Sequence, residues 1–263
     1  VRGIVKTCTF LIALMFLLTT VGFMASGADI MDGVVGVWLF DEGSGDKAED
    51  SSDAGNDGDF QGKPKWVKGK FGKCLEFSGS GDFIEVPDAK SLDLEGAVTM
   101  VCWFNWEGTG DGWQTFFSKG PMSGPNENYA HFTNSGGRHT HFCKNAGGAR
   151  NCFNSPNNAF EVGKWHHTAA IYDGKSQYTY IDGKLVAEAK LSGKMVTNDN
   201  YLGLGFREGS GHYWKGMLDD MALFNRALSG DEVEEIMDNG LETVMAVTPQ
   251  DRLTVMWGTI KSR

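Results

Sequence analysis

The chain has 263 residues, and its 34 acidic and 24 basic side chains give a formal net charge of −10. Aromatic residues make up 12 % of the chain, enough to bury a hydrophobic core, which excludes wholesale disorder. The acidic balance argues against nucleic acid as a partner, because phosphate binding needs a basic face. The 36 glycines and only 6 prolines favour many short strands joined by tight turns.

Residues 1–28 have the composition of an export signal. Arg2 and Lys6 precede an unbroken apolar run at 10–18, and small residues occupy 25–28. This order predicts a secretory signal peptide, and therefore a secreted or otherwise extracytoplasmic protein, in the periplasm or at the cell surface. The alternative is a permanent membrane anchor. A spanning helix needs roughly 20 apolar residues, and this run is shorter, so no stable membrane span is expected after signal removal.

Short apolar runs separated by turn residues recur from residue 34 onward. The Asp182-Gly183 pair tolerates positive φ at both positions and predicts a two-residue hairpin turn. Asp173-Gly174 marks a turn shortly before it, so this region should form a three-stranded meander. The predicted strands are 34–40, 74–77, 83–86, 98–106, 113–119, 129–133, 139–143, 165–172, 177–181, 184–189, 201–206 and 213–225. Without helical crossovers between them, they indicate an antiparallel sandwich.

One short helix is predicted near the C-terminus. Ser229 is a candidate N-cap, Glu232 completes a capping box three residues later, and Gly240 stops the helix. Residues 241–263 then read as a final strand or tail. The chain is therefore divided into a signal peptide (1–28), a single β-sandwich domain (29–240) and this C-terminal segment.

Four cysteines remain after the signal peptide, and an even number in an oxidising compartment suggests disulfides. Cys143 and Cys152 flank the Gly-rich segment KNAGGARN, so a bridge between them would close a short loop. Cys74 and Cys102 lie inside apolar runs. They either pair with each other or act as small buried hydrophobic residues, and both alternatives stay open.

His139, His141 and Cys143 alternate along one predicted strand, so they project from the same face. Together with His131 on the preceding strand they form a candidate zinc or copper set. A bridged Cys143 would not be a thiolate ligand, however, so a polar ligand-binding surface at His139 and His141 is the favoured interpretation.

Five ordered segments resemble a known family. They are GVWLFDEGSGDKAEDSS (36–52), GKFGKCLEFSGSGDFIEVPDAKSLDL (69–94), VTMVCWF (98–104), GKWHHTAAIYDGKSQYTYIDGKLV (163–186) and YWKGMLDDMALFNRALSGDEVEEI (213–236). In this order they resemble a laminin-G-like jelly-roll domain of the concanavalin A-like lectin/glucanase superfamily, over about 34–240. The resemblance implies an all-β, antiparallel two-sheet jelly-roll sandwich with one short C-terminal helix. It does not by itself imply a function, because the fold carries binding modules, adhesion domains and enzymes.

Calcium is the predicted cofactor. The segment DSSDAGNDGDF places Asp50 and Asp57 among several possible oxygen ligands in one loop. For this loop by itself, a polar turn held by its own Asp and Asn side chains is the favoured interpretation. Relatives in the superfamily often bind calcium at the rim of the sandwich, and this resemblance adds Asp82 and Asp219 as candidate ligands.

Glycosidases of the superfamily carry paired carboxylates in an E-x-D-x-E arrangement on one strand, and no predicted strand contains one. No enzymatic activity is therefore expected. Sugar-binding sandwiches instead use exposed aromatic residues beside turns, which makes Trp113, Tyr213 and Trp214 candidates. Because neighbouring strand residues face opposite sides, only one of Tyr213 and Trp214 should be exposed.

The combined prediction is a secreted, non-catalytic binding module. Carbohydrate at the cell surface or outside the cell is the preferred ligand. The alternative is a protein-adhesion or structural surface domain whose partner is an extracellular protein. A glycoside hydrolase ranks behind both.

Overall fold

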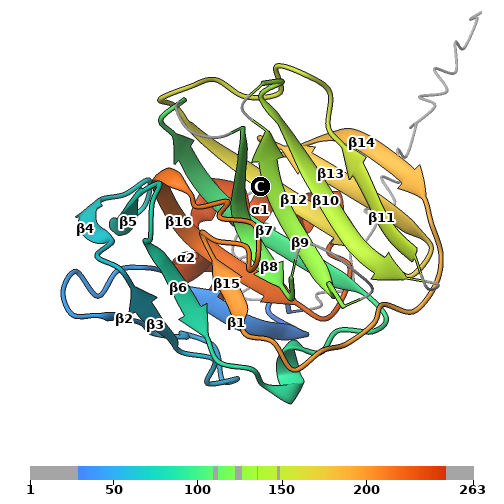
Figure 1. Cartoon of the computed structure of the whole chain (residues 1–263), viewed down its shortest axis with the longest axis horizontal. Coiled ribbons are helices and arrows are strands. Elements are labelled where there is room, and N and C mark those ends of the chain that lie inside the picture. Colours follow the sequence, from blue (N-terminus) through green and yellow to red (C-terminus); the bar gives the residue numbers. More distant parts are fainter. Residues whose placement is uncertain (1–28, 109–111, 122–125, 135, 147–148, 247–263) are drawn as a thin grey trace, which may run out of the picture.

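The computed structural model describes residues 29–108, 112–121, 126–134, 136–146 and 149–246. Two antiparallel eight-stranded sheets stack face to face as a sandwich (Figure 1). The predicted all-β sandwich is therefore confirmed. The predicted signal peptide and residues 247–263 of the predicted C-terminal segment lie outside the described residues.

The first sheet contains the predicted meander. Asp182 and Gly183 adopt φ values of 48° and 73°, the left-handed conformation that the hairpin turn requires. This turn joins β13 to β14, and β12 pairs with β13 on the other side. In spatial order the sheet consists of β14 (Lys184–Lys190), β13 (Ser176–Ile181), β12 (Trp165–Tyr172), β7 (Val98–Trp106), β16 (Lys215–Phe224), β5 (Lys73–Ser78) and β4 (Lys65–Lys68), with β1 (Val34–Trp38) also paired to β16.

The second sheet includes several strands that the sequence did not indicate. In spatial order it consists of β11 (Ala149–Asn154), β10 (His139–Ala146), β9 (Tyr129–Asn134), β8 (Trp113–Lys119), β15 (Leu202–Leu204), β6 (Phe83–Val86), β3 (Gly58–Gln61) and β2 (Lys47–Ala48). The unpredicted strands are β2, β3 and β11 in this sheet and β4 in the first sheet. All four are short, carry few apolar residues and lie at or next to a sheet edge, so they lack the apolar signal of a buried strand.

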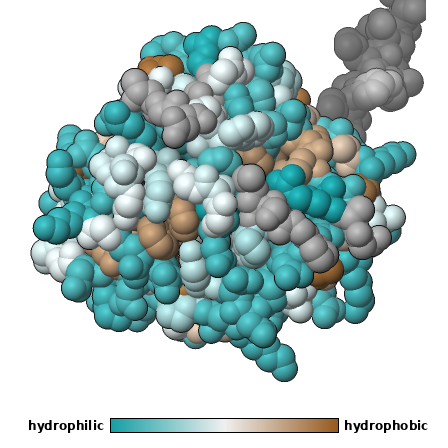
Figure 2. Space-filling model, viewed as in Figure 1, coloured by the Kyte–Doolittle hydropathy of each residue, from teal (hydrophilic) through white to brown (hydrophobic). Residues whose placement is uncertain are grey.

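Large aromatic side chains fill the space between the sheets. Phe104 of the first sheet and Phe116 of the second have ring centroids 5.0 Å apart. Trp214 lies 4.8 Å from Phe116 by the same measure and is fully buried. Trp38 is also fully buried, and its indole Nε1 donates to the Asn56 carbonyl oxygen at 2.9 Å. The described surface in Figure 2 is mostly hydrophilic, and its apolar areas are small and separate.

The predicted helix is confirmed as α1 (Gly230–Asn239), with the full Ser229–Glu232 capping box. Its buried Val233 and Ile236 belong to a second apolar cluster with Val101 and Ile171, which covers the outer face of the first sheet. A second helix, α2 (Leu241–Ala246), follows at once, so the first part of the predicted strand or tail is helical. A 3-10 turn, η1 (Lys90–Leu92), precedes β7. No helix in the described ranges is long and apolar enough to cross a membrane.

Candidate functional site

A groove of about 500 Å³ lies on the outer face of the second sheet, over strands β8 to β11. Strand register explains its composition. Phe132, His141 and Asn154 are direct partners across β9, β10 and β11, and directly paired residues share one face of a sheet. Phe142 and Lys144, one and three residues after His141 along β10, face the other sheet instead. The groove is lined by Trp113, Phe132, His141, Cys143, Arg150, Cys152, Asn154, Arg207 and His212.

The wall of the groove is aromatic. Trp113, at the start of β8, is partly exposed, and its ring centroid lies 4.4 Å from that of His141 and 5.5 Å from that of Phe132. The His141 and Phe132 rings are parallel to within 2° at a centroid distance of 5.2 Å. Packing against His141 and Phe132 restrains Trp113, so a ligand ring could stack on it with little further loss of side-chain freedom.

An ion-paired cluster lies at one side of the groove. The Glu127 carboxylate is fully buried and accepts from Arg150 Nε at 2.6 Å and from Arg207 Nη2. The Arg207 guanidinium carbon lies 4.6 Å from the Phe132 ring centroid, a cation–π contact. Arg207 reaches the groove from the loop after β15, so the site combines strand residues with a residue distant in sequence.

The two neighbouring histidines of β10 share a hydrogen bond. Their Nε2 atoms lie 2.6 Å apart, so one ring donates and the other accepts. Burial, assisted by the charge of His139, lowers the pKa of His141 to about 3. His141 is therefore neutral near pH 7, and it faces the groove as a polar aromatic ring rather than as a cation.

The structure separates the predicted ligand-binding residues into three groups. Trp113 and His141 line the groove, and His139 adjoins them through its hydrogen bond to His141. Tyr213 lies elsewhere: it is partly exposed and stacks on Phe206 with ring centroids 4.6 Å apart. Trp214 is fully buried in the inter-sheet core, so its prediction as a ligand-binding residue is wrong. Only one of the two residues is exposed, as predicted, although both lie in the loop before β16 rather than in a strand.

The predicted histidine–cysteine metal set does not form. His131 pairs with Phe142 rather than with His141, so it faces the core, where its Nε2 lies 2.9 Å from the Thr168 hydroxyl. Cys143 is bonded to Cys152 and is not a thiolate. Within the described residues, no group of three or more His, Cys, Asp and Glu side chains is arranged to hold a metal ion.

The candidate calcium ligands Asp50 and Asp57 form one network of backbone hydrogen bonds. Asp50 accepts from the backbone N–H groups of Val37, Ser52 and Asn56 at 2.8–2.9 Å. Asp57 accepts from the backbone N–H of Asp50 at 2.9 Å. Both carboxylates thus organise the turn before β3, which matches the interpretation of this loop as a polar turn.

Asp82 and Asp219 also bind backbone. Asp82 accepts from Lys63 and Ser78 N–H groups at 2.7 and 3.0 Å. Asp219 accepts from Lys70, Phe71 and Asp220 N–H groups, which ties β16 to the loop before β5. Burial, together with the charge of Asp220, raises the pKa of Asp219 to about 8. Calcium binding at these four aspartates stays a prediction.

The disulfide prediction is confirmed for one pair. Cys143 and Cys152 are direct partners on β10 and β11 and form a bond below the groove. Cys74 and Cys102 are buried and free. They lie on β5 and β7, which are separated by β16. Two strand spacings amount to roughly 10 Å, beyond the Cα separation that a disulfide spans, so their possible pairing is excluded.

The sequence did not predict most of the residues that line the groove or pair beside it. Arg150 belongs to the segment KNAGGARN, which was interpreted only as a loop between cysteines. If Cys143 and Cys152 are taken as direct partners on two neighbouring strands, Arg150 falls on the same sheet face as His141. Arg150 lies two residues from Cys152, and His141 lies two residues from Cys143. Glu127 and Arg207 carried no such signal, since their pairing depends on tertiary structure.

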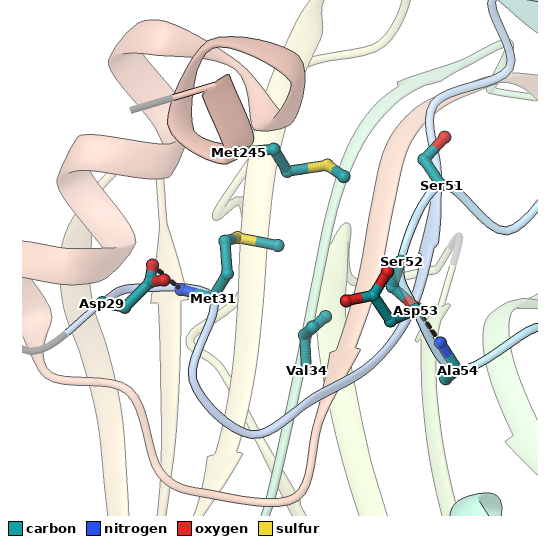
Figure 3. Close-up of a pocket in the computed structure, with 8 residues that line it drawn as sticks. All are labelled: Asp29, Met31, Val34, Ser51, Ser52, Asp53, Ala54 and Met245. Carbon is teal, nitrogen blue, oxygen red and sulfur yellow. Dashed lines mark hydrogen bonds between the residues drawn. The ribbon is translucent and has the colours of Figure 1, made fainter. Parts of the chain in front are cut away.

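Two other depressions are weaker candidates. One of about 520 Å³ lies between α2 and the N-terminal segment (Figure 3), where Met31 and Met245 line it with Asp29 and Asp53. It contains no aromatic ring, and its Asp29 carboxylate already accepts from the Met31 N–H at 3.0 Å. It therefore lacks the stacking surface of the β8–β11 groove.

The other depression lies on the first sheet, beside α1, and includes Trp103 and Trp165. The Lys70 Nζ is 4.1 Å from the Trp103 ring centroid, so this chain's own cation already covers that ring. Trp165 is partly exposed.

Several solved structures share the fold. Domain 4 of an extracellular arabinanase from Geobacillus stearothermophilus, solved with arabinotriose, superposes with a TM-score of 0.60 at 18 % identity, covering 78 % of this chain and 98 % of that one. The binding domain of Paraclostridial Mosquitocidal Protein 1 gives 0.63 at 17 % identity, over 80 % and 52 %. A Trypanosoma rangeli sialidase gives 0.59 at 17 % identity, over 78 % and 32 %. The chain thus spans about half of the toxin domain and about a third of the sialidase.

Sequence comparison assigns the family. Comparison with curated protein sequences gives no match. The Laminin_G_3 family profile matches residues 78–234, more than half of the chain, from the end of β5 into α1. The chain therefore belongs to the Laminin_G_3 family of the concanavalin A-like lectin/glucanases superfamily.

Proposed function

We propose that this protein is a non-catalytic carbohydrate-binding module whose binding site is the β8–β11 groove. The observation that carries the proposal is the partly exposed Trp113 ring, held by His141 and Phe132 beside polar side chains. Sugars combine apolar C–H faces with hydroxyl groups. An aromatic wall with a few convergent polar groups is suited to both.

The polar groups of the groove suit hydroxyl recognition. Asn154 offers both a carbonyl acceptor and amide donors, and neutral His141 adds its Nδ1, since its Nε2 already shares a hydrogen bond with His139. The Cys143–Cys152 bond and the ladder between β10 and β11 restrain the strands that present these groups. A preformed site loses less conformational entropy on binding.

Structural neighbours support a binding role. The arabinanase domain was solved with arabinotriose, and the toxin neighbours are described as binding domains. Because identity with them is below 25 %, their ligands do not transfer residue by residue. The toxin domains keep the protein-adhesion alternative open, and the experiment below separates it from sugar binding.

Two further aspects belong to the proposal. Hydrolysis of a glycosidic bond generally needs a carboxylate pair at the substrate, and no carboxylate is among the described residues that line the groove. This favours binding over hydrolysis there. The disulfide and the predicted signal peptide both favour an extracytoplasmic location.

A glycan array followed by titration with the best glycan tests the proposal. Trp113→Ala should lower affinity at least about tenfold. Trp165→Ala is the matched control, because it removes a partly exposed tryptophan from the opposite sheet. Loss of binding with Trp165→Ala instead would contradict the assigned site. Binding to extracellular proteins but to no glycan would favour the adhesion alternative.

A further inference from the structure

The charge of the groove is opposite to that of the chain. The protein carries a net charge of −10, yet two arginines and no carboxylate are among the described residues lining the groove. The acid that pairs with both arginines, Glu127, is fully buried and neutralises only one of the two guanidinium charges. The groove is therefore a local positive site on an acidic protein.

Both arginines keep unused donors. Arg150 gives Nε to Glu127 and Nη2 to the Cys143 sulfur at 3.2 Å, and no described residue accepts from its Nη1. Its side chain is 34 % exposed, so this donor is available to a ligand. The Arg207 side chain is 1 % exposed, and its buried Nε has no hydrogen-bond partner among the described residues. A buried donor without a partner is destabilising until something binds it.

No other described group in the groove supplies the missing negative charge. His141 and His212 line the groove, and neither can carry negative charge as an imidazole. Asn154 is neutral. No described residue of the groove supplies this partner, and an anionic ligand can do so.

We infer that the sugar bound in this groove is acidic and presents its carboxylate to Arg150, while its ring lies against Trp113. This inference rests on the proposed function and names the ligand class of the same site, a uronic-acid glycan. A hydrogen bond from a guanidinium N–H to a carboxylate is charge-assisted, and it is stronger than one to a neutral hydroxyl. The Arg150 Nη1 donor and the positive potential of Arg207 make the carboxylate the preferred substituent.

A pair of polymers that share one backbone and differ in whether their carboxyl groups are ionised or methyl-esterified tests the inference. Polygalacturonate and its fully methyl-esterified form are compared by affinity gel electrophoresis and titration with the whole protein. We expect the acid form to bind at least about tenfold more tightly than the ester. Raising sodium chloride from about 0.05 M to about 0.5 M should weaken only the acid form, because salt screens exposed charges.

Three variants localise the effect. Arg150→Gln should remove the preference for the acid form, and Arg150→Lys, which keeps the charge without the planar fork, should retain part of it. Lys184→Gln makes the same charge change on an exposed residue of β14 in the other sheet and should change nothing. Melting curves for each variant confirm that the protein is folded.

Each alternative outcome contradicts a defined statement. Equal binding of acid and ester, abolished by Trp113→Ala, overturns the acidic ligand but leaves carbohydrate binding intact. Tighter binding of dextran sulfate, or equal binding of polyglutamate, overturns the uronic-acid assignment. Absence of binding to every glycan overturns both this inference and the proposed function.

Discussion

The buried carboxylate of Glu127 gives the sharpest stability prediction. Glu127→Gln keeps the shape of the side chain but removes the charge that pairs with both Arg150 and Arg207. The Arg207 side chain is 1 % exposed, so water cannot replace the lost partner. Breaking one side of a buried ion pair costs about 3–5 kcal/mol. Arg150 adds little, because its exposed part is screened by solvent.

The expected change is large enough for routine melting experiments. In a protein of this size each kcal/mol shifts the melting temperature by about 2–4 °C, so Glu127→Gln should lower it by roughly 10 °C. Glu95→Gln is the matched control, since Glu95 pairs with Lys194 at 2.9 Å while the two side chains are 54 % and 82 % exposed. That variant should lose less than about 1 kcal/mol. Equal effects of the two substitutions would refute the argument that burial sets the strength of the pair.

Three other predictions address the core, the C-terminal helix and calcium. Burial lowers the pKa of His167 to about 3, below the unfolded value near 6.5, so its contribution to stability is lost as pH falls from about 6.5 toward 3. Neither His167 ring nitrogen has a hydrogen-bond partner among the described residues, so His167→Phe should stabilise the folded protein by about 1 kcal/mol at pH 7. The substitution should also make stability, measured by urea denaturation, depend less on pH. An unchanged pH dependence would contradict this prediction. Ser229→Ala should destabilise by about 1 kcal/mol through loss of the capping box, whereas Ser229→Thr should retain most of the stability; equal urea midpoints for the two variants would count against the cap. Calcium should raise the melting temperature by a few degrees over chelator, and Asp82→Ala should abolish the shift; identical curves would leave Asp50, Asp57, Asp82 and Asp219 as turn residues.

Local patterns in the sequence determined most of the fold. The strands β6, β7, β8 and β12 have the predicted bounds, because each is a compact apolar run bounded by turn residues. The Asp182-Gly183 hairpin and the Ser229 cap followed from backbone and side-chain chemistry within a few residues. Such features are local, so neighbouring residues suffice to specify them. The edge strands were missed because partly exposed strands need no apolar pattern.

Local sequence patterns determined only part of the candidate binding site. Alternation along β10 placed His139 and His141 on one face, and Trp113 was identified as an aromatic residue beside a turn. Alternation alone gives no inter-strand register, and register decided that Phe132 rather than His131 shares the face of His141. Only the tertiary structure brought Glu127 and Arg207, 80 residues apart, into a buried ion pair beside the groove, because such a contact depends on how two distant loops pack.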